Sequence, residues 1–177
     1  GGNTSIDGLA LYDREQENIN AGFHWSARRA KSDMEAASIC SDYSRYAVQI
    51  FDVRKTPRAR IDWFERGLAA AKMLADPKAE VPHLIGLGAA EGSLGNTERA
   101  IKIYEQALEI ASKFQLPQEA RIQSNLGLKY RDLGLKYRSA ANIERAIGCF
   151  EEQRAISQQS DDPRGVSAAL VNLGNAF

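Results

Sequence analysis

The sequence predicts an all-α protein in which antiparallel helix pairs are stacked in a repeating array. The dipeptide Leu-Gly recurs at 87–88, 126–127 and 173–174, with spacings of 39 and 47 residues. Apolar residues follow a helical period in nearly every segment, and the sequence has no convincing alternating strand pattern. A fixed period near 40 residues is typical of helical units that bury their apolar faces only against neighbouring units. Such an array predicts a surface that holds a partner.

The larger Leu-Gly spacing contains a local duplication. Residues 127–133, Gly-Leu-Lys-Tyr-Arg-Asp-Leu, are followed directly by 134–140, Gly-Leu-Lys-Tyr-Arg-Ser-Ala, and removal of one copy reduces the spacing to 40. Seven residues are close to two helical turns, so an insert adds about 10 Å of helix and nearly preserves its facing. The sequence favours a lengthened helix. The alternative is a helix that ends at Gly134, followed by a loop over 135–141.

Capping residues and prolines define the helix boundaries. Ser32-Asp-Met-Glu35 has the pattern of a capping box. Five other capping side chains stand where a helix is expected to begin: Thr56, Asp76, Asn96, Asn142 and Asp162. Together these signals predict helices over 7–30, 33–53, 58–74, 78–94, 97–114, 118–140, 143–159 and 164–177. The short connections predict that neighbouring helices are antiparallel.

The same signals predict the domain organisation. Residues 1–31 form an N-terminal linker helix, and 32–177 form the array, with repeats at 32–76, 77–115 and 116–160 and a half repeat at 161–177. A half repeat cannot bury its apolar face alone. We therefore expect a fragment of a longer chain, in which another molecule or a swapped helix covers that face.

The second helices of the pairs align with one another. Phe64, Tyr104 and Phe150 occupy the same place, and each ring is expected to pack between the two helices of its pair. Gly67 is one turn further on and allows a close approach of backbones. At the corresponding place Gln153 predicts looser packing or polar groups that face out.

These residues resemble the tetratricopeptide repeat (TPR) over about 38–177. The shared pattern is Leu-Gly followed by an aromatic residue (Tyr130), a small residue (Ala100 or Ala146) and the aromatic ring of the second helix. The period is similar to that of the long-repeat type in kinesin light chains and bacterial signalling proteins. The resemblance implies a right-handed TPR-like superhelix (an α-solenoid) whose first helices line a concave face. Val48, Glu91 and Gln153 depart from the pattern.

A second resemblance precedes the repeats. Glu15-Gln-Glu-Asn-Ile-Asn-Ala-Gly-Phe-His-Trp25 is similar to the helix that joins a nucleotide-binding switch module to its repeat array in bacterial NB-ARC and related STAND proteins. This implies the sensor or interaction region of an ATP-dependent signalling switch. The sequence has no Gly-x-x-x-x-Gly-Lys-Ser/Thr motif, so the ATPase is not in this chain.

Composition argues against several classes of function. Lys and Arg number 23 and Asp and Glu number 23, whereas nucleic-acid binders normally have a basic excess. The sequence has no run of 18 apolar residues, so it predicts no membrane span. Cys40 and Cys149 lie in apolar helical patterns and are expected to be free fillers rather than a disulfide, which suits a cytoplasmic protein.

The sequence offers little chemistry, and we expect no enzyme, no cofactor and no metal site. His24 is expected beside the packing face of Trp25, and His83 in the first turn of a helix. Trp25 and Trp63 are expected in the core. Residues 54–60 place four positive charges across one turn, either as a solvated loop or as a patch for phosphate or an acidic partner.

Candidate partner-binding residues lie on the predicted first-helix face. They are Arg121, Ser124, Asn125, Leu128, Arg131, Asp132, Arg138 and Asn172. Asn125 and Asn172 each precede Leu-Gly, and an amide both donates and accepts, which suits a peptide backbone. The alternative is an exposed asparagine or one that links two helices. The duplicated region is locally basic, which favours an acidic peptide or the protein's own switch domain.

The expected function is a protein- or peptide-binding scaffold. The alternative is a self-assembly module that stacks through its open C-terminal half repeat. A small-ligand sensor is a third hypothesis, and it would need an aromatic-lined pocket that the sequence does not locate.

Overall fold

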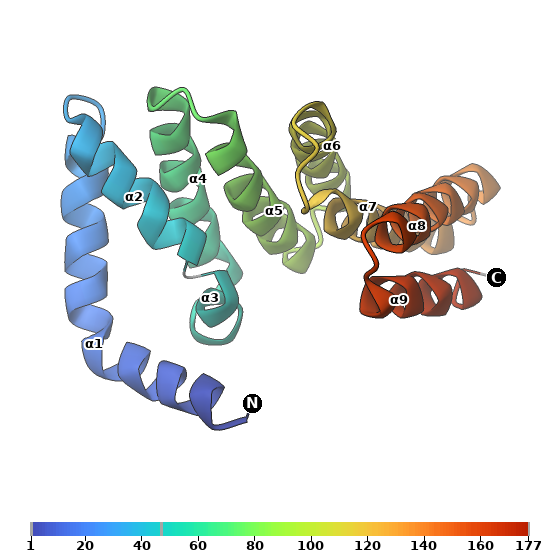
Figure 1. Cartoon of the computed structure of the whole chain (residues 1–177), viewed down its shortest axis with the longest axis horizontal. Coiled ribbons are helices and arrows are strands. Elements are labelled where there is room, and N and C mark those ends of the chain that lie inside the picture. Colours follow the sequence, from blue (N-terminus) through green and yellow to red (C-terminus); the bar gives the residue numbers. More distant parts are fainter. Residues whose placement is uncertain (1, 47, 177) are drawn as a thin grey trace. The chain divides into compact units, whose positions relative to one another are not determined.

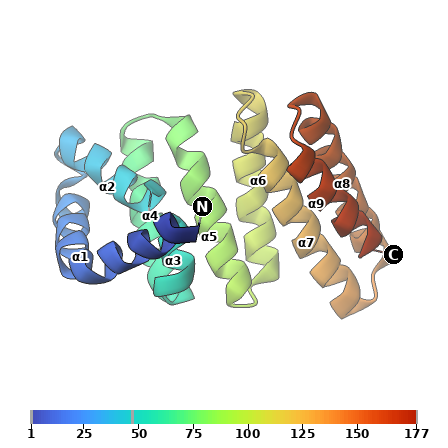
Figure 2. The same cartoon turned by 60° about the horizontal axis from the view of Figure 1, so that its bottom comes forward.

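The computed structural model describes residues 2–46 and 48–176, and every regular element in these ranges is a helix (Figures 1 and 2). The helices are α1 (Gly2–Arg29), α2 (Met34–Tyr46), α3 (Val48–Arg54), α4 (Pro57–Met73), α5 (Pro77–Ser93), α6 (Thr97–Lys113), α7 (Glu119–Tyr137), α8 (Ala140–Gln159) and α9 (Pro163–Gly174). The chain forms two compact units, residues 1–86 and 87–177, which divide within α5. The all-α prediction is confirmed.

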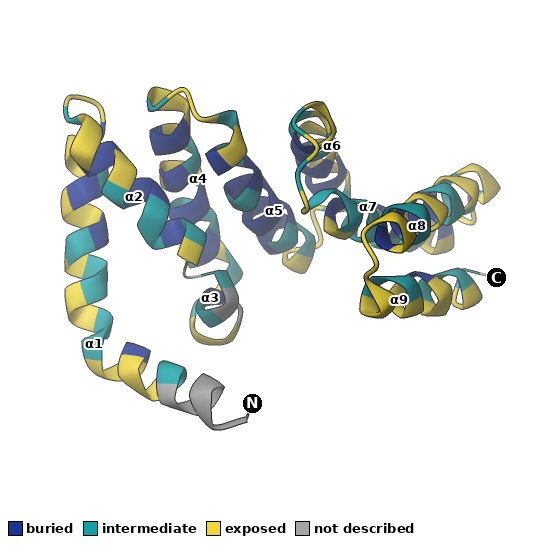
Figure 3. Cartoon of the chain, viewed as in Figure 1, coloured by how far each residue is buried: buried dark blue, intermediate teal, exposed yellow. Residues whose placement is uncertain are grey.

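An aromatic cluster forms the core of the first unit. The ring of Phe23 in α1 stacks on Trp63 in α4, with centroids 3.6 Å apart and planes at 9°. Phe51 in α3 meets Trp63 edge-on at 4.7 Å and Phe64 at 6.0 Å. Three helices therefore share one buried cluster. Figure 3 shows that each of α1, α3 and α4 has buried segments.

Trp25 was expected in this core, and that prediction is wrong. Its side chain is 41% exposed, and the guanidinium of Arg29 lies over its ring at 4.9 Å. Phe23 takes the inward position because residues two apart on a helix point to nearly opposite sides. His24 accordingly lies beside Phe23 rather than Trp25, with ring centroids 5.5 Å apart. The prediction for Trp63 is confirmed.

Basic residues at the end of α3 connect α1 to the rest of the first unit. Arg54 donates two hydrogen bonds to the carboxylate of Asp13, both 2.7 Å long. Lys55 donates to Asn20 at 3.1 Å, and its ammonium lies 4.6 Å from the Trp63 ring. Two of the four charges therefore pair with side chains of α1, and Arg58 is exposed, as expected for a solvated position.

Rings of the second helices pack on the glycines of the Leu-Gly pairs. A Cβ atom on Gly88 would lie 2.7 Å from Cε1 of Tyr104, and one on Gly127 would lie 2.4 Å from Cε1 of Phe150. The expectation that these rings lie between paired helices is confirmed. Phe64 contacts Phe51 of α3 and also faces Gly86 of α5.

The duplication lengthens α7 without disturbing its packing against α6. Tyr130 donates to Glu105 at 2.7 Å, and Tyr137 donates to Glu98 at 3.5 Å. The two tyrosines are seven residues apart on α7, and the two glutamates are seven apart on the antiparallel α6. The added turns thus repeat one side-chain contact in register, and the looped alternative over 135–141 is wrong.

The predicted end of this helix, at residue 140, is three residues too late. Tyr137 is the last helical residue, and Arg138 adopts the left-handed conformation with φ 51°. Ser139 then accepts from the backbone N–H of Asn142 at 3.4 Å and begins α8. Asn142 is therefore inside the first turn of α8 and is not its cap.

Other boundary predictions are partly corrected. The predicted helix 33–53 is two helices, α2 and α3. Asp33, not Ser32, caps α2, since its carboxylate accepts from the backbone N–H groups of Glu35 and Ala36 at 3.0 and 3.1 Å. The three capping residues that precede proline are confirmed, because each accepts a first-turn N–H: Thr56, Asp76 and Asp162.

Polar departures from the repeat pattern are buried at helix contacts. Glu91 is buried and accepts from Arg99 at 3.0 Å and from the amide of Asn96 at 2.7 Å. These contacts link the end of α5 to the start of α6. The side chain of Asn96 therefore binds Glu91 and does not cap α6. Gln153 is also buried, and its amide donates to the Gly165 carbonyl at 3.4 Å. The expectation that its polar group faces out is wrong.

His83 is a core residue of the first unit. It is the seventh residue of α5, beyond the predicted first turn, and it is fully buried. Its Nε2 forms a 2.9 Å hydrogen bond with the hydroxyl of Ser41. A Cβ atom on Gly67 would lie 2.8 Å from the imidazole Cε1, so Gly67 does provide the expected close approach. Burial, and secondarily the charge of Arg45, lowers the pKa of His83 to about 4.

Candidate functional site

The predicted partner-binding residues gather on one side of α7 and α9 in the second unit. We call this the first-helix face and define it by Ser124, Asn125, Leu128, Arg131, Asp132 and Asn172. All six are half-buried. The five of them that belong to α7 recur at helical spacing, beside the position where Gly127 receives the ring of Phe150.

One contact joins α9 to α7 on this face. The amide of Asn172 donates to the hydroxyl of Ser124 at 3.4 Å, across 48 residues of sequence. This bond uses one N–H of the Asn172 amide, and its carbonyl remains an acceptor. Asn172 thus fits the alternative in which it links two helices, while it retains hydrogen-bonding capacity for a ligand.

Charges on the face partly neutralise one another. Lys129 donates to Asp132 at 2.6 Å, and a terminal nitrogen of Arg131 lies 3.9 Å from the same carboxylate. The stem of Lys129 lies over Gly92 of α5, where a Cβ would be 3.5 Å from its Cδ. Asp132 therefore reduces the local basic excess expected from the duplicated sequence.

Two predicted residues are more exposed than this cluster. Arg121 is exposed near the start of α7, and Arg138 is exposed just beyond its end. Between them, Tyr130 belongs to the packing and not to the face. Burial, together with its hydrogen bond to Glu105, raises the pKa of Tyr130 to about 12.

The described part of the chain offers no group of three or more His, Cys, Asp or Glu side chains that could hold a metal ion. Both cysteines are free thiols. Burial raises the pKa of each to about 11. No helix among the described residues is long and apolar enough to cross a membrane.

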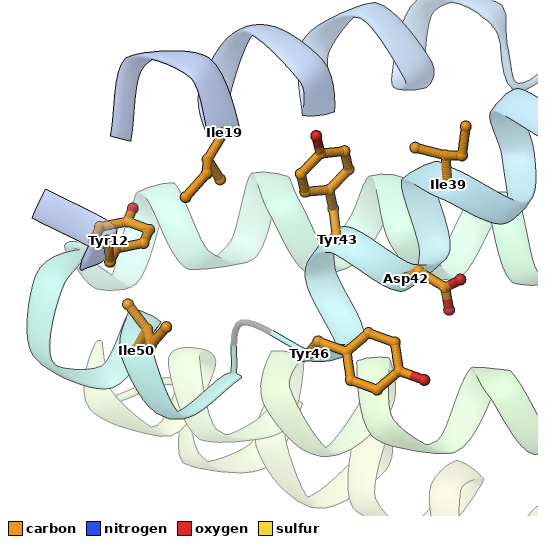
Figure 4. A pocket seen from close by; sticks show the side chains of 7 residues that line it. All are labelled: Tyr12, Ile19, Ile39, Asp42, Tyr43, Tyr46 and Ile50. Carbon is orange, nitrogen blue, oxygen red and sulfur yellow. The ribbon is translucent and has the colours of Figure 1, made fainter. Parts of the chain in front are cut away.

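An open, solvent-facing cavity in the first unit was not located from the sequence. It has a volume of about 440 Å³ and lies between α1, α2 and α3 (Figure 4). Three tyrosines and three isoleucines form most of its wall: Tyr12, Ile19, Ile39, Tyr43, Tyr46 and Ile50. The only local signal is the pair Tyr43 and Tyr46, three residues apart on one helix. The rest depends on how α1 folds back, which the repeat pattern does not describe.

Comparison with known proteins identifies the fold. Neither a family model nor a curated protein matches the chain. The chain is similar to the crystal structure of BtubC (BKLC) from P. vanneervenii, with a TM-score of 0.73 and 21% identity. This alignment covers 93% of this chain and 65% of BtubC, so the chain spans slightly less than two thirds of that protein.

Two further crystal structures are from Podosopora anserina, of a candidate kinesin light chain with nearly identical TPR-like repeats and of a variant of it. Each has 15% identity, with TM-scores of 0.46 and 0.47, and the alignments cover 90% and 92% of this chain and 85% and 86% of theirs. The fold of this chain is an α-solenoid of stacked helix pairs, similar to that of BtubC.

Proposed function

We propose that this chain is a non-catalytic scaffold that binds a protein or peptide on the first-helix face. The observation that carries the proposal is the meeting of Ser124 and Asn172, which places the polar groups of α7 and α9 side by side. Half-buried amides beside an apolar residue, Leu128, suit an extended peptide, since an amide pairs with any peptide group regardless of its side chain. A helical scaffold of this fold supports binding of a protein partner in general.

A library of random dodecapeptides, displayed and selected on the intact chain, tests this proposal. For selected peptides we expect the double variant Asn125→Ala and Asn172→Ala to weaken binding about thirtyfold, since each of the two lost hydrogen bonds contributes about 1 kcal/mol. The matched control is Glu151→Ala, an exposed residue of the second helix α8. Peptides that bind all three proteins equally would place the binding surface elsewhere.

The charge of the preferred peptide is a separate point. Arg138 is exposed, so Arg138→Glu changes charge with little effect on packing, whereas Arg131 is half-buried beside Asp132. We propose that the partner is an acidic segment or the protein's own switch domain. Reversal of both arginines should then weaken binding of acidic peptides, most strongly at low salt. Unchanged affinity at low salt would exclude an acidic partner here.

We also propose that the chain is the sensor or interaction region of a larger STAND-type signalling ATPase of the bacterial cytoplasm. The support is the sequence resemblance of the segment from Glu15 to Trp25, which lies on α1 and packs on the array through Phe23. A nucleotide-binding motif upstream in the same gene would agree with this role. A gene that encodes no such motif would contradict it.

Self-assembly is the second candidate function. The terminal helix α9 exposes Leu170 and Val171, at 51% and 63% of their surface. An exposed apolar pair on a helix of a stacked array suits contact with another copy. Molar mass measured by light scattering against protein concentration distinguishes a scaffold that stays monomeric from one that assembles.

A further inference from the structure

We infer that α9 of one copy of this chain accepts the ring of Trp25 from α1 of a second copy. This inference rests on the self-assembly candidate above and adds to it the two surfaces that meet. Because the two surfaces differ, each copy binds one neighbour through α1 and another through α9. Such head-to-tail contacts build open chains or rings of copies rather than symmetric pairs.

The acceptor on α9 is a glycine position that a ring occupies elsewhere in the array. Gly88 lies against the ring of Tyr104, where an added Cβ would be 2.7 Å from Cε1. Gly127 lies against the ring of Phe150 at 2.4 Å in the same sense. Gly174 is the third glycine of the Leu-Gly series, and a Cβ there would meet no atom of the described residues within 4 Å. The same notch therefore lies open on α9.

The surface beside this notch is apolar and exposed. Leu170 lies one turn before Gly174 and is 51% exposed. Its counterpart in α5 is Leu84, one turn before Gly88, and that side chain is 3% exposed. Residues four apart on a helix share a face, so Leu170 and Gly174 form one strip. Covering this strip with a second helix would remove apolar surface from water, which favours association.

Trp25 is the exposed ring that matches the rings of the array. The rings that occupy the glycine notches each follow an alanine by four residues: Ala100 before Tyr104, and Ala146 before Phe150. Three large aromatic side chains are exposed in the described part of the chain: Trp25, Tyr46 and Tyr137. Of these, Trp25 alone follows an alanine, Ala21, by four residues, and Ala21 is exposed as well. A small residue one turn from the ring lets two helices approach closely.

The ring of Trp25 is held on the outside of a packed helix. Phe23 anchors α1 through its stack on Trp63, and Trp25 points away from that stack with 41% of its surface exposed. The guanidinium of Arg29 lies 4.9 Å from the Trp25 ring centroid and restricts its motion. Because the ring is already ordered, its burial in a partner costs little conformational freedom.

The charges at the ends of the two helices are complementary. Three exposed cations stand at the end of α1: Arg28, Arg29 and Lys31. Two exposed carboxylates precede α9: Asp161 and Asp162. If the two helices pair antiparallel, with Trp25 on Gly174, the end of α1 runs toward the start of α9. Opposite charges then lie at the same end of the contact, which favours this orientation of the two copies.

Two complementary variants test the inference on the intact chain. Trp25→Ala removes the donor ring and keeps the acceptor, whereas Gly174→Leu fills the acceptor and keeps the donor. Each variant alone should associate about thirtyfold more weakly than the wild type, as expected for a central aromatic contact of an interface. An equimolar mixture should form pairs of twice the mass of one chain and nothing larger, because each copy has one blocked surface. Sedimentation velocity over a concentration series measures all of these masses.

Matched controls come from the same kinds of position. Tyr46→Ala removes another exposed ring of the first unit, and Gly148→Leu fills another glycine position where a Cβ would meet no atom within 4 Å. Both controls should associate as the wild type does. The two test variants should keep the thermal midpoint of the monomer, since Trp25 is exposed and Gly174 has free space beside it.

The possible outcomes separate this inference from self-assembly in general. A wild type that stays monomeric at every concentration would overturn both. Association that Trp25→Ala leaves unchanged would retain self-assembly and overturn the contact between α1 and α9. A mixture of the two variants that is no heavier than either alone, while the wild type associates, would overturn that contact as well.

Discussion

Gly127 shows how one residue decides the spacing of two helices. The Phe150 ring occupies the space that a side chain on Gly127 would need. Gly127→Ala should therefore force the ring or the helix to move, and overpacking of this kind costs about 1–3 kcal/mol. We expect urea unfolding to show this loss in the second unit.

Gly148 is the matched control for this change. It also lies within a helix, α8, but a Cβ there would meet no atom within 4 Å. Gly148→Ala should stabilise the protein by about 0.5–1 kcal/mol, because alanine loses less conformational freedom in a helix. Equal effects of the two substitutions would show that the Phe150 ring does not depend on the glycine.

His83 predicts a dependence of stability on pH. Its pKa falls from 6.5 to about 4 in the folded protein, chiefly because burial disfavours the charged imidazolium. As the pH decreases below 6.5, the unfolded chain takes up the proton first. The contribution of the neutral histidine is therefore complete above pH 6.5 and is lost progressively between pH 6.5 and 4.

The variant His83→Gln isolates this effect from the carboxylates that titrate in the same range. Glutamine keeps an amide that can hydrogen-bond Ser41, and it does not titrate. The difference in unfolding free energy between wild type and variant, measured from pH 7.5 to 4, should decrease by a few kcal/mol at the acid end. A constant difference across that range would mean that His83 is not buried in its neutral form.

At the scale of the element, the helix ends share one geometry. Five helices in succession, α4 to α8, are followed by a residue with positive φ: Ala75, Gly95, Gln115, Arg138 and Asp161. Glycine adopts this left-handed conformation without strain, whereas other residues do so at a cost of roughly 1–2 kcal/mol. Four of the five ends therefore use a residue that is not optimal for the geometry.

Gln115→Gly should accordingly raise the thermal midpoint of the second unit, with a gain of about 0.5–1 kcal/mol. The control is Gln106→Gly, an exposed position inside the same helix α6, where glycine should destabilise by about 1 kcal/mol. Gly95→Ala should also destabilise. If both glutamine substitutions act in the same direction, the left-handed geometry at 115 does not limit stability.

These elements also show what could be predicted from the sequence. The period of 40 residues located α5 to α9 within a few residues, because each helix pair there repeats the contacts of the preceding pair. The same phase placed Ser124 and Asn172 on one face. In the first unit, whether Phe23 or Trp25 enters the core depends on stacking with Trp63. Trp63 is 40 residues from Phe23, so no local pattern could decide between them. The cavity depends on that packing in turn, so no local pattern could reveal it.

At the scale of the whole molecule, the formal net charge is zero at pH 7. A neutral protein has little electrostatic repulsion to oppose contact between apolar surfaces. With Leu170 and Val171 exposed on α9, we expect the weight-average mass to increase with concentration near pH 7. Leu170→Glu with Val171→Lys removes the apolar pair and keeps the net charge, so it should lower that increase. Light scattering that shows one mass at all concentrations would exclude association through α9.

Each of the two units contains a single cysteine, Cys40 in α2 and Cys149 in α8. Because both thiols have a pKa of about 11, only about one in 10⁴ is ionised at pH 7 in the closed state. An alkylating reagent that attacks thiolates should therefore react mainly when the surrounding helices open. Peptide mapping of the modified sites at successive times would then give the rate at which each unit opens, and no label has to be introduced.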